Sequence, residues 1–169
     1  EYENVTTTLL KQISSDEDSA IVAALEGGIK NVDPFAFDDA KFFSRLPKKV
    51  ANLQPFCNHF DGELNAAFLQ KLVAESMKIK FDDGTSFKVR MNTLIVPPAM
   101  FAAAMQASQV EDVVYTDKDG SLKTTKNWIA VSRMIHQIVV MDINPKTWYL
   151  CESFNTDRAI GALSLIVNP

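Results

Sequence analysis

Glycine is scarce in this sequence, with only six among 169 residues. Glycines build the loops that cradle nucleotide phosphates, and they flank the serine nucleophile of many hydrolases. The chain has no glycine-rich phosphate loop, no Gly-x-Ser-x-Gly segment and no His-Glu-x-x-His segment. The common short motifs of these enzyme classes therefore give no support to a catalytic role.

Cysteine and histidine are also scarce, with two of each. Cys57 and Cys151 do not make a disulfide framework, and we expect two reduced, buried thiols. Cys57 and His59 form one Cys-x-His pair, whereas zinc sites usually carry closely spaced ligands at both ends. His136 lies in an apolar stretch and is predicted to pack in the core. We therefore predict no catalytic residue, no metal site and no cofactor.

The chain has no excess of basic over acidic residues, and it has no long apolar run. The net charge is −4 and the pI is about 5.2, whereas nucleic-acid-binding proteins usually present a basic face. The densest basic cluster, at Arg45, Lys48 and Lys49, is interpreted as a solvated turn. No run of about 18 apolar residues indicates a membrane span, and the acidic start of the chain is unlike a signal peptide.

One acidic segment has part of a calcium-loop pattern. Asp117 and Asp119 alternate ahead of Gly120, but an EF-hand loop needs three alternating oxygen ligands before its glycine and a later glutamate. The glycine comes too early here, and no glutamate follows before Glu152. Because aspartate and glycine suit tight turns, the segment predicts a solvated turn.

The remaining composition is ordinary for a folded protein, with 47% hydrophobic and 22% charged residues. A chain of this length can bury roughly 70% of its extended surface. It therefore needs neither a disulfide nor a metal to fold, and it fits one domain or two small lobes that share a core.

The first predicted helix covers residues 6–30 and ends at the glycine pair 27–28. Ser14 and Glu17 match a capping box, so this helix either restarts there or runs unbroken from about residue 8. A second helix is predicted over residues 63–80, where apolar side chains recur at helical spacing and form one stripe.

Strands dominate the second half of the prediction. Residues 93–96 form a short apolar run that indicates a buried strand, and Pro98 then opens a helix over residues 99–108. We expect residues 94–96 and Trp148 to be buried in one shared core. The other predicted strands cover residues 110–116, 134–141, 147–153 and 162–167. Helices and strands do not alternate regularly, so the predicted class is α+β.

Aromatic residues concentrate in the irregular segment 31–61, which holds six of the eleven phenylalanines and three of the seven prolines. A disordered linker would carry few aromatic rings. We interpret the segment as an ordered excursion whose rings pack on the main core. The alternative is a pocket that binds a ring, which would also need convergent polar groups.

Four segments occur in a recognisable order. Residues 91–100, Met-Asn-Thr-Leu-Ile-Val-Pro-Pro-Ala-Met, join an apolar run to a helix through two prolines. Upstream are residues 39–44, Asp-Ala-Lys-Phe-Phe-Ser, and a helix that opens at Asn65-Ala66-Ala67-Phe68 and ends in Lys80-Phe81-Asp82-Asp83-Gly84. Downstream, after a turn at residues 144–146, comes Thr147-Trp148-Tyr149-Leu150. Together, from about residue 20 to residue 167, these segments resemble the major head subunits of Mu-like phages.

The resemblance implies the Hong Kong 97-type capsid fold, an α+β fold with a spine helix and an axial domain whose central mixed sheet is flanked by helices. It assigns residues 1–32 to the spine-helix region of the peripheral domain, residues 33–152 to the axial domain and residues 153–169 to a strand that returns to the peripheral domain. The implied protein is a structural subunit and not an enzyme. It is made in the bacterial cytoplasm and self-assembles into the icosahedral head of a phage or prophage virion, which encloses DNA.

The implied partners are copies of the same chain in pentamers and hexamers, and other head proteins such as portal or scaffold. Packaged DNA is contacted only non-specifically, and no membrane is involved. A mildly acidic subunit suits a shell that must not grip its DNA.

The sequence also departs from the family. The N-terminal arm and extended loop that normally precede the spine helix are missing, and Arg45-Leu46-Pro47 replaces a frequent Asp-His-Pro. The chain also lacks an initiator methionine. We therefore expect a processed, trimmed or divergent subunit, which by itself is a monomer or a weak oligomer.

Three other functions remain open at this stage. An encapsulin-type shell shares the fold class but encloses enzymes. An α+β enzyme with an unrecognised site would use His59 or His136. A small binding module would present the phenylalanine-rich segment to a partner, and its rings would then be exposed.

Overall fold

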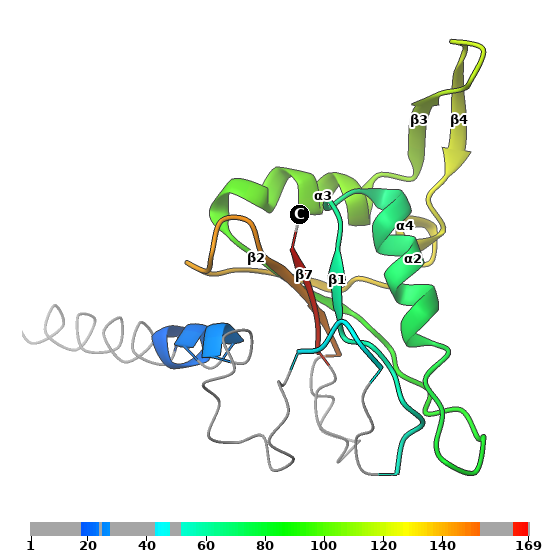
Figure 1. Cartoon of the computed structure of the whole chain (residues 1–169). Coiled ribbons are helices and arrows are strands. Elements are labelled where there is room, and N and C mark those ends of the chain that lie inside the picture. Colours follow the sequence, from blue (N-terminus) through cyan, green and yellow to red (C-terminus); the bar gives the residue numbers. More distant parts are fainter. Residues whose placement is uncertain (1–17, 24, 28–42, 48–51, 153–163, 169) are drawn as a thin grey trace, which may run out of the picture.

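The computed structural model describes residues 18–23, 25–27, 43–47, 52–152 and 164–168 (Figure 1). They contain both helices and strands, so the chain is α+β as predicted. The elements are β1 (His59–Asp61), α2 (Ala66–Ser76), β2 (Thr93–Val96), the 3-10 helix η1 (Pro98–Met100), α3 (Phe101–Gln109), β3 (Asp112–Thr116), β4 (Leu122–Lys126), α4 (Trp128–Val131), β5 (Gln137–Val140), β6 (Trp148–Cys151) and β7 (Ser164–Asn168).

Five strands form one mixed sheet in the order β1-β7-β6-β2-β5. Strand β2 is parallel to β5 and antiparallel to β6. Strand β7 is antiparallel to β6 and parallel to β1. The strand expected to return to a separate peripheral domain therefore shares a sheet with β2 and β6, and the three-part division of the chain stays a prediction.

The two faces of this sheet belong to two different cores. Side chains alternate along a strand, so Leu94 and Val96 join one cluster while Ile95 joins the other. We expected Trp148 and all of residues 94–96 to share one core. That expectation is correct for Leu94 and Val96 and wrong for Ile95, which pairs with Tyr149 on the opposite face.

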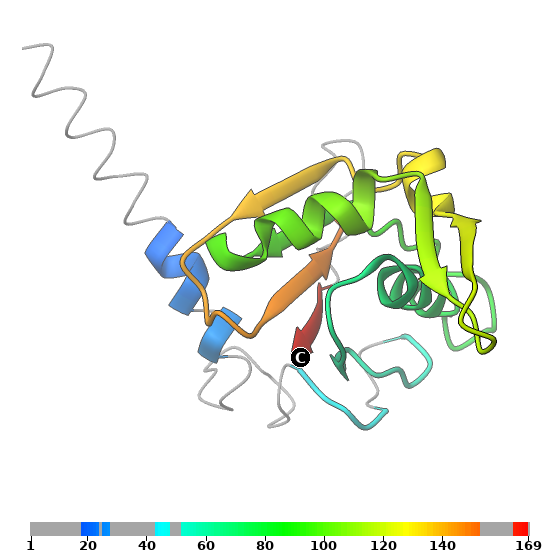
Figure 2. The same ribbon diagram turned by 90° about the horizontal axis from the view of Figure 1, so that it is seen from above.

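The first core contains side chains of α2, α3 and α4, and Figure 2 shows α3 (green) lying over the sheet. Its fully enclosed side chains include Leu69 and Leu72 of α2, Ala104 of α3 and Trp148 of β6. The predicted apolar stripe of the second helix is thus confirmed for Leu69, Leu72 and Val73, whereas Met77 at its end is exposed. The ring of Phe68 meets the Trp148 indole edge-on, with centroids 6.3 Å apart.

Helix α2 is shorter than the predicted range 63–80 for a local reason. Asn65 takes an extended conformation, and its side-chain oxygen accepts a hydrogen bond from the Phe68 amide, which starts the helix there. At the other end, the Ser76 hydroxyl donates to the Val73 carbonyl at 2.7 Å. Such local side-chain bonds favour helix ends, and the chain then leaves towards the buried Ile79.

The second core covers the other face of the sheet. Its buried members are Phe43, Met141, Ile143 and Tyr149. Val22 and Leu25, from the helical residues 18–23 and 25–27, pack against them. The first predicted helix is therefore helical where it is described, and its remaining residues, including the capping pair, lie outside the described residues.

The phenylalanine-rich segment packs inward where it can be seen. Phe43 is buried in the second core, and Phe56 and Phe60 pack against the first. This confirms the expected packing for these three rings. The other three phenylalanines of the segment, at positions 35, 37 and 42, lie outside the described residues.

Three elements were not predicted, namely β1, β4 and α4. Strand β4 pairs with β3 to form a two-stranded hairpin that projects away from the sheet and helices (Figure 1). The predicted turn between them is confirmed, because the Gly120 amide donates to the Asp117 carbonyl at 2.9 Å. Gly120 has a φ of +80°, which glycine adopts without strain.

No helix in the described part of the chain is long and apolar enough to cross a membrane.

Candidate functional site: a phenylalanine-lined pocket and a projecting hairpin

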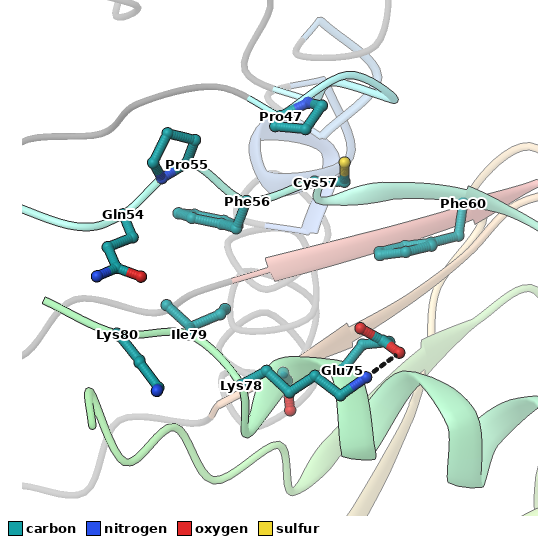
Figure 3. A pocket seen from close by; sticks show the side chains of 11 residues that line it. Pro47, Gln54, Pro55, Phe56, Cys57, Phe60, Glu75, Lys78, Ile79 and Lys80 are labelled. Atoms are coloured by element: carbon teal, nitrogen blue, oxygen red, sulfur yellow. Dashed lines mark hydrogen bonds and ion pairs between the residues drawn. The ribbon is translucent and has the colours of Figure 1, made fainter. Parts of the chain in front are cut away.

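A pocket of about 270 Å³ lies between the segment before β1 and the end of α2 (Figure 3). Two contacts fix its walls: the Gln54 amide donates to the Lys80 carbonyl at 2.8 Å, and Leu53 forms a bridge with Phe81. The lining residues are Pro47, Gln54, Pro55, Phe56, Cys57, Phe60, Glu75, Ser76, Lys78, Ile79 and Lys80.

The chemistry of this pocket is mostly apolar. Phe56, Phe60 and Ile79 supply rings and aliphatic surface, while the charged groups lie on the α2 side. Lys78 and Glu75 already form an ion pair at 2.6 Å, drawn as the dashed line in Figure 3. A small-molecule site needs polar groups that converge on the ligand and fix its orientation. Glu75 is paired with Lys78 and the Ser76 hydroxyl donates to the Val73 carbonyl, so Gln54 and Lys80 are the polar side chains that remain in the lining. We therefore interpret the pocket as a gap in the packing beneath the ordered segment.

The cysteines and histidines are not gathered into one site. Cys57 is half-buried in this pocket, so the expected burial is wrong for Cys57 and correct for Cys151. The Cys151 thiol lies 3.7 Å from the Thr93 carbonyl oxygen, and burial raises its pKa to about 11. His136 is exposed beside β5, which corrects the expectation of a core histidine. Within the described residues, no three His, Cys, Asp or Glu side chains form a group that could hold a metal ion.

His136 was misplaced because Met134 and Ile135 precede it and an apolar run resumes at Ile138, so the stretch as a whole is apolar. In the structure, it precedes β5, the last strand on its side of the sheet. Its backbone amide donates to the Asn92 carbonyl at 2.8 Å, while its side chain faces outward. The backbone of His136 is therefore bonded to the residue before β2 while its side chain is exposed.

The carboxylates of the turn with the partial calcium-loop pattern bind groups within the hairpin itself. The Asp119 carboxylate accepts from the Ser121 amide at 2.9 Å and from the Ser121 hydroxyl at 2.6 Å. The Asp117 carboxylate pairs with the Lys123 ammonium, and these hydrogen bonds hold the pKa of both aspartates below the ordinary value. The carboxylates thus stabilise the turn itself, as aspartates commonly do.

The basic cluster is also engaged where it is described. The guanidinium of Arg45 pairs with Asp61 at 2.7 Å, both side chains being exposed. The two lysines of the cluster, at positions 48 and 49, lie outside the described residues. Arg45 therefore offers a paired charge and not a free phosphate contact.

Two buried aromatic residues carry polar atoms with no hydrogen-bond partner among the described residues. They are the Trp148 indole nitrogen in the first core and the Tyr149 hydroxyl in the second. Desolvation, and to a lesser extent the charge of Glu26, raise the pKa of Tyr149. Because adjacent strand residues face opposite sides, these two side chains anchor one strand in both cores.

The buried side chain that organises the outer end of the helical layer is Asn127, between β4 and α4, which the sequence reasoning missed. Its amide nitrogen donates to the carbonyls of Ala107 at 2.8 Å and Val110 at 3.1 Å. Its oxygen accepts from the side-chain nitrogen of Gln70 at 2.9 Å and from the backbone amide of Ile129 at 3.2 Å. A single fully buried side chain thus ties α2, α3 and α4 together at the root of the hairpin.

The hairpin itself is exposed on both faces. Val114 is 61% exposed and Leu122 is 74% exposed, and the two point to the same side of the ribbon. Tyr115 points to the other side, next to Lys123. A two-stranded ribbon is at best marginally stable in water by itself, so these exposed apolar residues mark the hairpin as a candidate contact surface.

A groove of about 280 Å³ opens at the root of this hairpin. It runs between the start of α2 and the outer part of α3, and it ends on the first residues of β3. The lining residues are Leu64, Asn65, Ala66, Ala103, Gln106, Ala107, Val110, Asp112, Val113 and Val114. Asp112 is the one charged residue of this lining, and it pairs with Lys126 at 2.7 Å.

Comparison of the chain with protein-family models, with curated proteins and with solved structures found no match.

Proposed function

We propose that this protein is a structural shell subunit of the phage-head type, with the Hong Kong 97-type capsid fold, and that it acts by binding copies of itself. The observation that carries the proposal is the order of four sequence segments that resemble those of Mu-like head subunits. Each segment is short, and their common order and spacing over most of the chain give the argument its weight.

The local structure at these segments supports the proposal. The residues of segment 91–100 form β2, pass through Pro97 and Pro98, and enter α3 by way of η1. Residues 65–76 open and complete α2, and a turn follows at residues 82–84. Residues 148–150 belong to β6, at the centre of the sheet. These three segments form elements of the kind that the resemblance implies, while most of the fourth segment, residues 39–44, lies outside the described residues.

The surface chemistry is also compatible with a subunit that assembles. A negative net charge limits adhesion to packaged DNA. The projecting hairpin and the apolar groove at its root provide two different surfaces on one chain, and head-to-tail contacts between different surfaces are what closed rings require. None of these contacts needs a cofactor.

Expression of the complete gene product in bacteria, followed by electron microscopy of the purified particles, tests this function. We expect closed, uniform shells when the protein is produced with the head proteins encoded beside it. A complete product that stays monomeric under those conditions, and that turns over a small-molecule substrate, would overturn the proposal in favour of an enzyme.

The contents of the particles separate a phage head from an enzyme-filled compartment. A phage head should hold DNA, measured as a nuclease-resistant nucleic acid after surface digestion. Shells that instead hold one co-purifying enzyme, identified by mass spectrometry, would keep the shell function and reject the phage-head assignment.

A further inference from the structure

We propose that two copies of this chain associate through strand β5, each β5 pairing antiparallel with the other about a two-fold axis at Val139. The five-stranded sheets of the two copies then join into one sheet. This contact does not require the proposed shell function, because a two-fold contact can form between two copies alone. It is supported by the open edge of β5, the order of side chains along the strand and the exposed apolar surface beside it.

Strand β5 forms one edge of the sheet, and Figure 2 shows it along the rim beside α3. On its inner side, the amides of Gln137 and Met141 donate to carbonyls of β2 and of the residue before it, at 3.3 and 3.0 Å. Because backbone groups of a strand alternate in direction, the amides and carbonyls of Ile138 and Val140 point outward. Among the described residues, no backbone group bonds to this outer side.

The opposite edge of the sheet is protected, unlike this one. At β1, the amides of Asn58 and His59 donate to the Ser44 carbonyl, both at 3.1 Å, and Asp61 is paired with Arg45. Proteins usually protect an edge strand with lysine, proline, an inward-pointing charge or a covering segment. Strand β5 has the sequence Gln-Ile-Val-Val, which contains none of these residues. Such an edge is suited to pair with another strand.

The side chains along this strand make it complementary to itself. Ile138 and Val140 stand one residue to either side of Val139, and His136 and Asp142 stand three residues to either side. These four share one face of the strand, since side chains alternate. In an antiparallel pair centred on Val139, Ile138 lies opposite Val140 of the other copy and His136 lies opposite Asp142, each pair occurring twice. The strand therefore fits a second copy of itself.

This register is favoured over its neighbours. A shift of two residues is the smallest that keeps outward backbone groups opposite one another. It would place Asp142 opposite either Ile138 or Met134 of the other copy. A carboxylate beside an aliphatic side chain loses water without gaining a hydrogen bond, whereas oppositely charged cross-strand pairs stabilise a sheet.

The polar residues at the two ends are available for this pairing. His136 and Asp142 are exposed, and neither side chain has a hydrogen bond or ion pair among the described residues. Arg133 has the same sign as a protonated histidine, so it does not oppose the contact. Lys146, the cation nearest to Asp142 along the chain, follows in the turn at residues 144–147, and it forms no ion pair with Asp142.

Apolar side chains beside the edge extend the contact beyond the backbone. Val140 is 45% exposed, and Phe101 and Met105 of α3 are each 43% exposed. Helix α3 packs on β2 and β5, and its Ala103 and Gln106 line the groove towards α2. Phe101 and Met105 are four residues apart, so they share a face of the helix, on the side away from that groove. The two-fold axis brings both α3 helices to the same face of the joined sheet, where these side chains lose water.

The predicted dimer is weak, because a four-residue ladder with a narrow apolar strip is a small interface. We expect a dissociation constant of ~10–100 µM, measured by sedimentation equilibrium. Unsubstituted protein that stays monomeric at ~500 µM would reject a second copy as the occupant of this edge and would leave the shell function standing. Dimers without shells under any condition would keep this contact and count against the shell function alone.

A single cysteine at the two-fold axis tests the register. Val139→Cys, in a Cys57→Ala background that removes the half-buried thiol, brings two identical positions face to face. Their Cα atoms would lie ~4.5 Å apart, as in other non-hydrogen-bonded antiparallel pairs, which is within reach of a disulfide. We expect a covalent homodimer after mild oxidation at ~100 µM protein.

Gln137→Cys is the matched control, on the same face of the same strand and more exposed than Val139. In the proposed register, its counterpart lies four residues away, about 13 Å, so it should give at least ~10-fold less covalent dimer. An equal or greater yield from Gln137→Cys would overturn the register.

Exchange of the polar pair tests whether these residues face each other. His136→Glu sets two acidic residues opposite one another, and Asp142→Lys sets a cation opposite His136. Each should weaken dimerisation at least ~5-fold, because like charges directly opposite destabilise a sheet. The double substitution His136→Glu with Asp142→Lys restores opposite charges and should bring the dissociation constant back to within ~2-fold. Two weakened single variants with no rescue in the double variant would overturn the pairing.

A charge on the edge itself gives the last measurement. Val140→Lys imitates the lysines that protect natural edge strands and should weaken dimerisation at least ~10-fold. Val114→Lys makes the same exchange at another exposed valine, on the projecting hairpin, and should dimerise as the unsubstituted protein does. Equal weakening by both substitutions would reject β5 as the contact.

Discussion

The side-chain amide of Asn127 donates to the Ala107 carbonyl oxygen at 2.8 Å, and this bond fastens the end of the hairpin to helix α3. Ala107 is also part of the groove wall, so one buried side chain sets the hairpin and the groove in fixed relation to each other. Asn127 therefore fixes the direction in which the hairpin leaves the layer of helices.

Replacing this side chain tests that role. Asn127→Ala removes both donors and the acceptor, and it leaves the carbonyls of Ala107 in α3 and of Val110 just after it without this partner. We expect a loss of about 2–4 kcal/mol in the free energy of unfolding, measured by urea titration. Asn144→Ala is the matched control, because Asn144 is exposed and its side chain accepts one bond, from the Lys146 amide. A similar, small effect of both substitutions would contradict this account.

Neighbouring residues of β2 are buried to different extents in the two cores, so their truncation should cost different amounts of stability. Leu94 is completely enclosed by the first core, so Leu94→Ala should cost about 2–5 kcal/mol. Ile95 is only half-buried in the second core, so Ile95→Ala should fall at or below the low end of that range. Chemical denaturation of both variants measures these losses in the free energy of unfolding. A larger loss for Ile95→Ala than for Leu94→Ala would show that the second core contributes more to stability than its burial suggests.

The buried thiol predicts a loss of stability in alkali. Burial raises the pKa of Cys151 from its ordinary value of 9.0 to about 11, so the folded state keeps a proton that the unfolded state has already lost. This contribution is complete below pH 9 and disappears as the pH rises to about 11, which amounts to roughly 2–3 kcal/mol. The raised pKa of Tyr149 acts in the same direction above its ordinary value of 10.0.

Unfolding measured from pH 8 to pH 11 should show this slope, and Cys151→Ala should make it shallower. Cys57→Ala serves as the control and should leave the slope as in the unsubstituted protein, because both buried groups remain. A Cys151→Ala slope identical to that of the unsubstituted protein would mean that the thiol ionises equally well in both states.

The two thiols should also differ in reactivity and should bind no catalytic metal. Cys57 is half-buried at the pocket surface, whereas Cys151 is buried and its pKa is raised, so we expect one fast and one slow thiol with dithiobis(nitrobenzoic acid).

Elemental analysis of the purified protein should find no stoichiometric zinc. One zinc per chain, together with protection of Cys57 from the reagent, would contradict the sequence interpretation of the Cys57–His59 pair.

The parts of the fold that the sequence predicts are those with a strong local cause. Two prolines after an apolar run predict the passage from β2 to α3, and the apolar stripe of α2 predicts the face that packs on the sheet. The turn at Gly120 follows from residue chemistry alone. Each of these patterns involves only a few neighbouring residues, so it predicts the local structure without knowledge of the tertiary structure.

Other parts depend on contacts that no local pattern reports. Strand β4 has the sequence Leu-Lys-Thr-Thr-Lys and is exposed throughout, so it lacks the apolar alternation by which a strand is recognised. Ile95 was assigned to the wrong core because a run of apolar residues does not show that both faces of a sheet are covered. Asn127 was missed because a buried asparagine with four hydrogen bonds looks, in sequence, like any polar residue before a helix.

The position of β7 has a kinetic consequence. This strand lies between β6 and β1, so β1 joins the sheet only by pairing with residues from the far end of the chain, with His59 opposite Ile166. Pairings of such long sequence separation form slowly, since a large loop must close first. While the ribosome is still making β7, strand β6 with its four buried residues stays an open edge, available to a β6 from another unfinished chain. A protein produced in many copies at once would then depend on a chaperone or on slow synthesis at this step, and the yield of soluble protein should fall as the rate of expression rises.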